Sequence, residues 1–318
     1  MDTTGIIAHK VGFRAVIPTG QYANIQPEIE FEDVDVESAK EMGMGFIKDL
    51  FSKYSEKGNL TEKFVAENTV ITESERIESF NENNVVIDFI KSSHQYSRDS
   101  VPFIGVTTFI KKFYKEFDSE AISKVSSKSW GVEQDDVKSF WDENRDLTAS
   151  FGSVVHKALE TYDKFKAMGN TISKKKGVDE NYALPRHPIL KEIVLGFIAM
   201  TKKLDMDSYH VVPEALVTDV SKNICGTADR VLIISPTKKI CRIQDYKVNI
   251  GSEEVKSSLK PLAPFSNLPA NKITKYQIQM SVYANMMEKS GWTVEGLDVF
   301  IYEKEWVHYK LDVLNVIN

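Results

Sequence analysis

The sequence predicts a mixed α/β protein, with a central mixed β-sheet flanked by helices and a small N-terminal α+β appendage. Apolar residues alternate with period two over 226–248, which is typical of paired strands. Residues 188–204 and 273–290 instead carry apolar side chains at helical spacing. A stretch rich in Glu, Asn, Ser and Thr ends near residue 84. We therefore expect an appendage and connector over 1–84 and a main domain over 85–318.

The composition excludes several classes of protein. A chain of 318 residues that is 42% hydrophobic can bury a substantial core. Its longest apolar runs, such as Val85–Ile90, are too short to span a membrane, and no basic, apolar leader opens the sequence. We therefore expect a cytoplasmic protein with no membrane partner. Cys225 and Cys241 are too few for a zinc knuckle or a four-thiolate iron–sulfur cluster.

The net charge of -6 argues against a protein that coats DNA indiscriminately. It leaves a nucleic-acid enzyme open, because a local basic groove matters more for such an enzyme than the net charge does.

The appendage is predicted to hold two strands and one helix. Residues 11–17 alternate between apolar and polar, and a second alternation begins at Ile29. Asp35 can cap a helix that ends near Tyr54. The connector over 60–84 is expected to carry some helix. The apolar stripe of the helix consists of Ala39, Met42, Phe46, Ile47, Leu50 and Phe51.

The main domain is predicted to begin with a strand at 85–89 and a hairpin over 94–104. A helix capped by Thr107 or Thr108 follows, and then helices over 119–129 and 133–145. The expected core residues of the first and last of these helices are Phe109, Ile110, Phe113, Tyr114 and Phe117, and Val137, Phe140 and Trp141.

A further helix is predicted from Phe151 to about Met168. Gly152, His156, Glu160 and Asp163 follow one ridge of it. Taken alone, His156 is a half-buried histidine paired with Glu160, while Gly152 permits close approach of a backbone or a substrate. A strand over 209–217 carries Glu214, and the helix 273–290 carries Gln279 and Tyr283 one turn apart.

The hairpin over 226–248 carries the candidate catalytic residues. Pro236 suits the second position of a type I turn, so the strands pair about Thr237. This register places Asp229 opposite Asp245, with Cβ atoms roughly 5 Å apart, close enough for two carboxylates to share a divalent cation. Period two then puts Lys247 on the same face as Asp245. Taken alone, two facing acids with a lysine are more typical of a solvated surface than of a catalytic site.

The same register predicts which residues lie opposite each other along the rest of the hairpin. Val231 is expected opposite Ile243, Ile233 opposite Cys241, and Ile234 opposite Ile240.

The order of the motifs along the chain favours a functional site over a solvated surface. Along the chain they are Gly152-x-x-x-His156, Glu214, Gly226-Thr-Ala-Asp229, Gln244-Asp245-Tyr246-Lys247 and Gln279-x-x-x-Tyr283. This series resembles the PD-(D/E)XK nucleases, and most of all the RecB-type branch, which includes phage exonucleases of the lambda-exonuclease kind. The resemblance covers about residues 85–318, and the motifs are specific through their order. Gly-Thr-Ala-Asp stands where the family name has Pro-Asp, and this departure leaves the acid in place.

The resemblance implies a restriction-endonuclease-like core and a metal-dependent DNA nuclease that hydrolyses phosphodiester bonds. The expected enzyme is an exonuclease in DNA recombination, DNA repair or phage DNA processing. By position, the catalytic residues are Asp229, Asp245 and Lys247. The ligands of Mg²⁺ or Mn²⁺ are His156, Asp229, Asp245, the backbone carbonyl of Tyr246 and, as the loosest match, Glu214. The substrate contacts are Gln279, Tyr283, Lys275 and Gly152.

These residue types suit phosphodiester hydrolysis, because carboxylates hold hard cations and a lysine can position water and offset developing charge. The resemblance further implies DNA as the partner, with a recombination annealing protein or helicase, in a bacterial or phage-infected cell. Two alternatives stay open: a nuclease-fold DNA-binding or scaffold subunit recruited to such a protein, and a nuclease acting on RNA. The oligomeric state is left open by the sequence.

Overall fold

The protein is a mixed α/β structure, as the sequence predicts. The computed structural model describes residues 8–15, 17–20, 23–32, 36–54, 69–90, 93–176, 184–248 and 260–317. The chain divides into two compact units, Met1–Gly105 and Val106–Asn318. The sequence placed this boundary after residue 84. The structure places it after Gly105, because the three strands that follow residue 85 extend the sheet of the first unit.

The first unit is built on an antiparallel sheet in the order β8-β7-β6-β5-β1-β4. Beside it lies a two-stranded sheet formed by β2 and β3. The ten residues of β5 form a strand where the sequence predicted a connector with some helix, because β5 pairs with β1 on one side and β6 on the other. The strands are β1 (Ala8–Ala15), β2 (Ile17–Gly20), β3 (Ala23–Ile25), β4 (Glu28–Glu32), β5 (Thr69–Glu78), β6 (Val86–Ile90), β7 (Gln95–Arg98) and β8 (Val101–Gly105).

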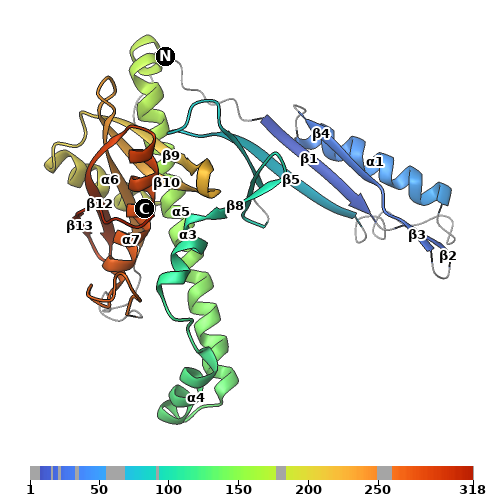
Figure 1. Ribbon diagram of the computed structural model, residues 1–318, viewed down its shortest axis with the longest axis horizontal. Helices are drawn as coiled ribbons and strands as arrows, with labels where there is room; N and C mark the ends of the chain where they lie inside the picture. Colours follow the sequence, from blue (N-terminus) through green and yellow to red (C-terminus); the bar gives the residue numbers. More distant parts are fainter. Residues whose placement is uncertain are drawn as a thin grey trace. The chain divides into compact units, whose positions relative to one another are not determined.

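Helix α1 (Val36–Tyr54) lies against this sheet (Figure 1). The alternation over 11–17 is confirmed, because its apolar members are buried together with Ala39, Ile47 and Phe51 of α1. Two members of the predicted stripe, Met42 and Phe46, are instead 47% and 41% exposed. Gly43 faces the sheet between them, and a Cβ there would lie 2.2 Å from the ring of Phe13. Asp35, the expected cap, lies outside the described residues.

The second unit contains a sheet in the order β13-β12-β11-β10-β9. Neighbouring strands are antiparallel except β11 and β12, which are parallel, so the sheet is mixed. The strands are β9 (His210–Asp219), β10 (Ile224–Ser235), β11 (Ile240–Val248), β12 (Thr293–Tyr302) and β13 (Trp306–Leu311).

The predicted register of the central hairpin is confirmed over most of its length. Val231 pairs with Ile243 and Ile233 with Cys241. Near the turn a bulge places Ser235, and not Ile234, opposite Ile240. The extra residue is accommodated next to the loop, so the pairing further along the hairpin keeps its register.

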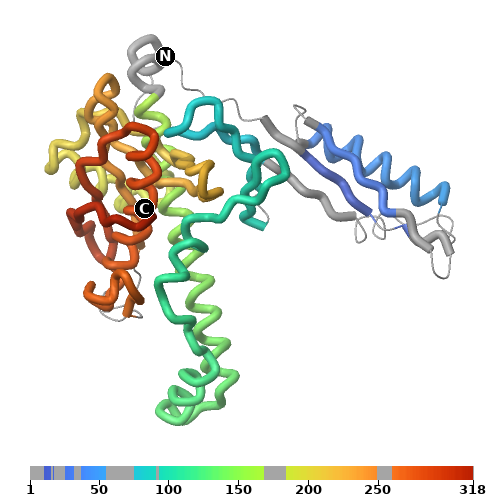
Figure 2. The backbone as a smooth tube through the Cα atoms, in the orientation of Figure 1, coloured from blue at the N-terminus to red at the C-terminus, as the bar shows by residue number. Residues whose placement is uncertain are grey.

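Helix α5 (Gln134–Lys176) is one continuous helix of 43 residues where the sequence predicted separate helices at 133–145 and 151–168. The intervening residues 146–150 contain neither Gly nor Pro, so nothing in them ends the helix. Helix α4 (Ser119–Trp130) folds back along the N-terminal part of α5, as Figures 1 and 2 show. Val137 is buried there, whereas Phe140 is 57% exposed, contrary to expectation.

The helix expected after Thr107 is shorter than predicted. It consists of α3 (Val106–Phe109) and the single 3₁₀ turn η1 (Ile110–Phe113), after which Tyr114 is extended. Phe117 consequently lies outside any helix and is 51% exposed.

Helices cover both faces of the second sheet. Helices α5 and α6 (Pro188–Lys203) pack on the face that carries Tyr246, in a core that includes Phe197, Phe300 and Trp306. Helix α7 (Lys272–Lys289) lies on the other face, where its Tyr276 meets Lys247. Among the described residues, no helix has the length and apolar character needed to cross a membrane.

Candidate active site

Asp229, Asp245 and Lys247 meet on one face of the central hairpin. The Lys247 ammonium nitrogen lies 2.5 Å from Oδ2 of Asp245 and 4.0 Å from Oδ2 of Asp229. The two acids are close enough to share a hydrogen bond. The geometric prediction for these three side chains is therefore confirmed. It follows from the hairpin register, since Arg230 pairs with Gln244 and the next pair outward is Asp229 with Asp245.

Two further predicted residues reach the same point from other elements. His156 on α5 places Nδ1 3.4 Å from Oδ2 of Asp229. Glu214 on β9 lies opposite Asp229, because the flanking pairs are Ala228 with Ala215 and Arg230 with Pro213. Glu214 has a φ of 50°, a left-handed conformation that costs a residue with a Cβ roughly 1–2 kcal/mol. The fold thus holds this acid in a strained backbone beside Asp229.

The main chain of Tyr246 also faces the cluster. Its N–H donates to Oδ2 of Asp229 at 3.1 Å, and its carbonyl accepts from Lys247 Nζ at 3.0 Å. A backbone hydrogen bond also links Tyr246 to His156. The carbonyl oxygen of Tyr246 therefore faces the same cluster as the carboxylates of Asp229 and Asp245.

The cluster contains more buried carboxyl groups than positive charges, and burial raises the pKa of two of them. Burial, with the neighbouring charge of Asp229, raises the pKa of Asp245 and raises that of Glu214 to about 8. Burial alone would lower the pKa of Lys247, but the two aspartates outweigh it and raise that pKa. Burial lowers the pKa of His156, which favours the neutral imidazole that can bind a metal.

The donor set fits a divalent cation of the Mg²⁺ or Mn²⁺ kind. It offers carboxylate oxygens, a carbonyl oxygen and one imidazole nitrogen, which are ligands such ions accept. Oδ2 of Asp245 is buried and, apart from the Lys247 ammonium, has no partner in the described part of the chain. No group of three or more His, Cys, Asp or Glu side chains among the described residues is already arranged to hold an ion. Lys247 now supplies the positive charge between the acids, so a cation would require this ammonium to shift.

A buried network that the sequence did not reveal supports the cluster from the other face of the sheet. Arg230 donates two hydrogen bonds, at 2.9 and 3.1 Å, to Asp163 on α5. The Tyr246 hydroxyl donates to the same carboxylate at 2.9 Å, and Arg230 also donates to Gln244 at 2.6 Å. Arg230 follows Asp229, and Tyr246 lies between Asp245 and Lys247, so this network fixes the backbone that presents all three.

The sequence analysis gives Asp163 no role beyond its place on the ridge of His156, and it does not single out Arg230. The signal that could have found them is strand alternation. An arginine next to Asp229 must point to the opposite, covered face, where it needs a buried acid.

A second buried carboxylate, Asp298 on β12, anchors the far side of β11. It accepts two hydrogen bonds from Arg242, at 2.8 and 2.9 Å. Nε2 of His308 lies 2.8 Å from its Oδ1. Burial opposes ionisation of Asp298, but these partners outweigh it and lower its pKa to about 2. The parallel pairing of β11 with β12 is therefore reinforced by an ion pair close to Asp245 and Lys247.

The four predicted substrate-contact residues have different surroundings. Gln279 and Lys275 line a groove beside α3 and η1. Tyr283 is buried, and its hydroxyl lies 3.0 Å from where a Cβ on Gly226 would be. No described atom lies within 4 Å of a Cβ built at Gly152, so that side of α5 is open.

Tyr276, which the sequence did not single out, also lies beside the candidate residues, since the Lys247 ammonium is 5.4 Å from its ring centroid. Burial raises the pKa of its hydroxyl. The family motif on this helix is Gln279-x-x-x-Tyr283, and Tyr276 lies three residues before Gln279, on the same helical ridge.

Comparisons with known proteins do not establish a family. No protein-family model and no curated protein matches the chain. Among solved structures, one described as "Crystal structure of SSO0001" matches with 13% identity and a TM-score of 0.23, over 50% of this chain and 68% of that one.

Proposed function

We propose that this chain is a metal-dependent DNA nuclease of the PD-(D/E)XK type, acting as an exonuclease in DNA recombination, DNA repair or phage DNA processing. The observation that carries the proposal is the convergence of Asp229, Asp245 and Lys247 on one face, with His156 and Glu214 beside them. A merely solvated pair of acids would stay exposed, whereas Asp245 is 5% exposed and burial raises its pKa.

Each residue has a distinct part in the proposed reaction. Asp229, Asp245, His156, Glu214 and the Tyr246 carbonyl would hold Mg²⁺ or Mn²⁺. When bound, such an ion lowers the pKa of water and neutralises charge on the phosphate. Lys247 has Nζ directed at the acids and would orient the attacking water and stabilise the negative charge that develops on the phosphorane.

Cleavage assays test this proposal. Linear and circular DNA, and RNA of the same sequence, would be incubated with Mg²⁺ or Mn²⁺, with Asp245→Ala and Lys247→Ala as the site variants. Lys304→Ala and Glu303→Gln are matched controls, since both residues are exposed and lie on the loop after β12. Removal of one metal-binding or charge-stabilising group is expected to reduce the rate by at least about 100-fold.

Loss of linear-DNA cleavage in the two site variants only, with circular DNA resistant, is the expected outcome. Equal activity in wild-type protein and both site variants would refute the assignment of these residues. DNA binding without any metal-dependent turnover would instead support a nuclease-fold binding subunit, and cleavage of RNA alone would support the RNA alternative.

A further inference from the structure

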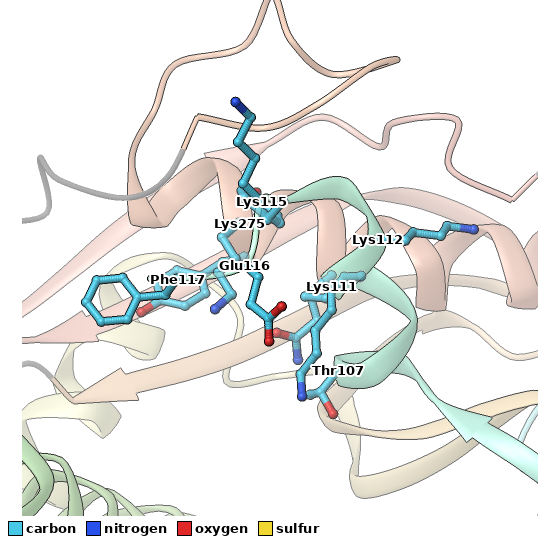
Figure 3. A pocket seen from close by; sticks show the side chains of 11 residues that line it. Thr107, Lys111, Lys112, Lys115, Glu116, Phe117 and Lys275 are labelled. Atoms are coloured by element: carbon cyan, nitrogen blue, oxygen red, sulfur yellow. The ribbon is translucent and has the colours of Figure 1, made fainter. Parts of the chain in front are cut away.

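A basic groove lies next to the candidate site, between residues 107–117 and helix α7. Its volume is about 820 Å³. Four of its lining residues are lysines and one is a glutamate, although the whole chain has a net charge of -6. Figure 3 shows Lys111, Glu116 and Lys275 along the middle of the groove, Lys115 on its upper rim and Phe117 at one end. Local charge of this kind favours a polyanion, whatever the net charge of the protein.

Aromatic rings are interleaved with these lysines. Phe117 is 51% exposed, and its ring packs edge to face on Trp141 of α5 at 6.1 Å, which holds it in place while one side stays open. Tyr114 and Tyr276 line the same groove. A groove of positive charge with open aromatic faces is the arrangement on which successive bases of a single strand stack.

The groove contains a hydroxyl that lacks a partner. The OH of Tyr114 is buried and makes no hydrogen bond to any described residue. Buried polar atoms of native proteins are nearly always hydrogen-bonded, so this hydroxyl is expected to have a partner, such as a water, beyond the described residues.

The groove is fixed relative to the candidate site. Leu262 donates to the carbonyl of Phe113 at 2.7 Å, and Phe265 packs on the ring of Phe113, so the wall at 107–117 is anchored from a distant segment. On the other wall, Tyr276 touches both the groove and the ammonium of Lys247. A strand lying in the groove would therefore lead to Asp229 and Asp245.

We infer that this groove binds an unpaired DNA strand and guides its end to the candidate site, so that the enzyme acts on single-stranded ends. Lys111, Lys115 and Lys275 would contact phosphates, and Phe117 would stack on a base. The inference rests on the proposed function for the direction of the strand. The binding itself can be measured without turnover.

The test uses the full chain in EDTA, so that no cleavage occurs, and a fluorescein-labelled 12-nucleotide DNA as single strand or as blunt duplex. Affinity is measured by fluorescence anisotropy over a range of salt concentrations. The variants are Lys111→Ser with Lys115→Ser, and Phe117→Ala. The matched control is Lys191→Ser with Lys202→Ser, which makes the same charge change on the exposed side of α6.

We expect the wild-type protein to bind the single strand at least 10-fold more tightly than the duplex. Loss of two phosphate contacts should reduce the slope of log affinity against log salt by about 1.4 in the Lys111 and Lys115 variant, with no change in the control. Phe117→Ala should weaken binding about 5- to 150-fold.

Equal salt slopes in the groove variant and the control variant, or tighter binding of the duplex, would overturn the inference. Because binding is read in EDTA, a catalytically silent protein that still binds single strands through these residues would refute the proposed function and leave the groove assignment standing. A protein that cleaves DNA but binds it independently of these residues would refute the groove assignment and leave the proposed function standing.

Discussion

Removal of the Asp163 carboxylate is the sharpest test of how the candidate site is held in place. In the wild-type protein the Arg230 side chain is 3% exposed and that of Asp163 is 1% exposed. Asp163→Ala leaves the guanidinium buried without an opposite charge and leaves the Tyr246 hydroxyl without its acceptor. Breaking a buried pair in this way costs about 3–5 kcal/mol. At about 2–4 °C per kcal/mol for a unit of roughly 150–250 residues, the melting temperature should fall by about 6–20 °C.

Tryptophan fluorescence is the appropriate assay, because every tryptophan of the chain belongs to the second unit. Unfolding of the first unit therefore does not obscure the transition. The four residues are Trp130, Trp141, Trp292 and Trp306.

The control is Asp142→Ala, which removes the partner of Arg145 in an ion pair whose side chains are 63% and 68% exposed. No measurable change is expected, because exposed ion pairs contribute little. A second variant, Asp163→Leu with Arg230→Met, should recover part of the loss, since it removes both charges. The remainder reflects the unpaired Tyr246 hydroxyl.

An Asp163→Ala variant that is no less stable than Asp142→Ala would refute the role of the buried ion pair. A double variant as unstable as Asp163→Ala would also refute it, since lost packing and not an unpaired charge would then be the cause. A functional consequence follows from the same geometry: Asp163→Ala should reduce cleavage even at temperatures where the protein stays folded, because the backbone on both sides of Arg230 and Tyr246 carries the catalytic groups.

Three further outcomes are expected. The depressed pKa of Asp298, about 2, should stabilise the fold by about 2–3 kcal/mol above the unfolded pKa of about 3.9, and this contribution should disappear as the pH falls from about 4 to 2. Urea unfolding over that pH range should show the dependence in the wild-type protein, and Asp298→Asn should lack it; identical slopes would contradict the assignment. Gly226→Ala should destabilise the second unit by about 1–3 kcal/mol, because its Cβ would lie 3.0 Å from two side-chain atoms, whereas Gly152→Ala should stabilise α5 by up to about 1 kcal/mol in thermal melts. If Gly152→Ala destabilised the protein and Gly226→Ala stabilised it, the close packing described at Gly226 and the open space described at Gly152 would both be contradicted. Mn²⁺ at 100 times its Kd should stabilise the wild-type protein by about 2.7 kcal/mol and raise its melting temperature, and Asp245→Asn should abolish that rise; a rise of equal size in the variant would place the ion elsewhere.

The first unit illustrates where local patterns suffice. The alternation over 11–17 and the position of α1 were predictable, because each depends on near neighbours in the sequence. The strand β5 was not, because a polar segment becomes a strand only when β1 and β6 satisfy its backbone hydrogen bonds. One partner, β6, follows β5 closely, but the other, β1, lies more than fifty residues earlier in the chain, and no local signal encodes that pairing.

The candidate site shows the same division. The sequence by itself determined that Asp229, Asp245 and Lys247 share a face, since a two-strand register and period-two alternation fix that relation. Only the tertiary structure decided that His156 and Glu214 reach the same point, and that Asp163 and Arg230 hold the hairpin from behind. Only the tertiary structure, likewise, brings the lysines of 107–117 beside α7. These contacts join elements far apart in the chain, and their geometry depends on how helices pack across a sheet.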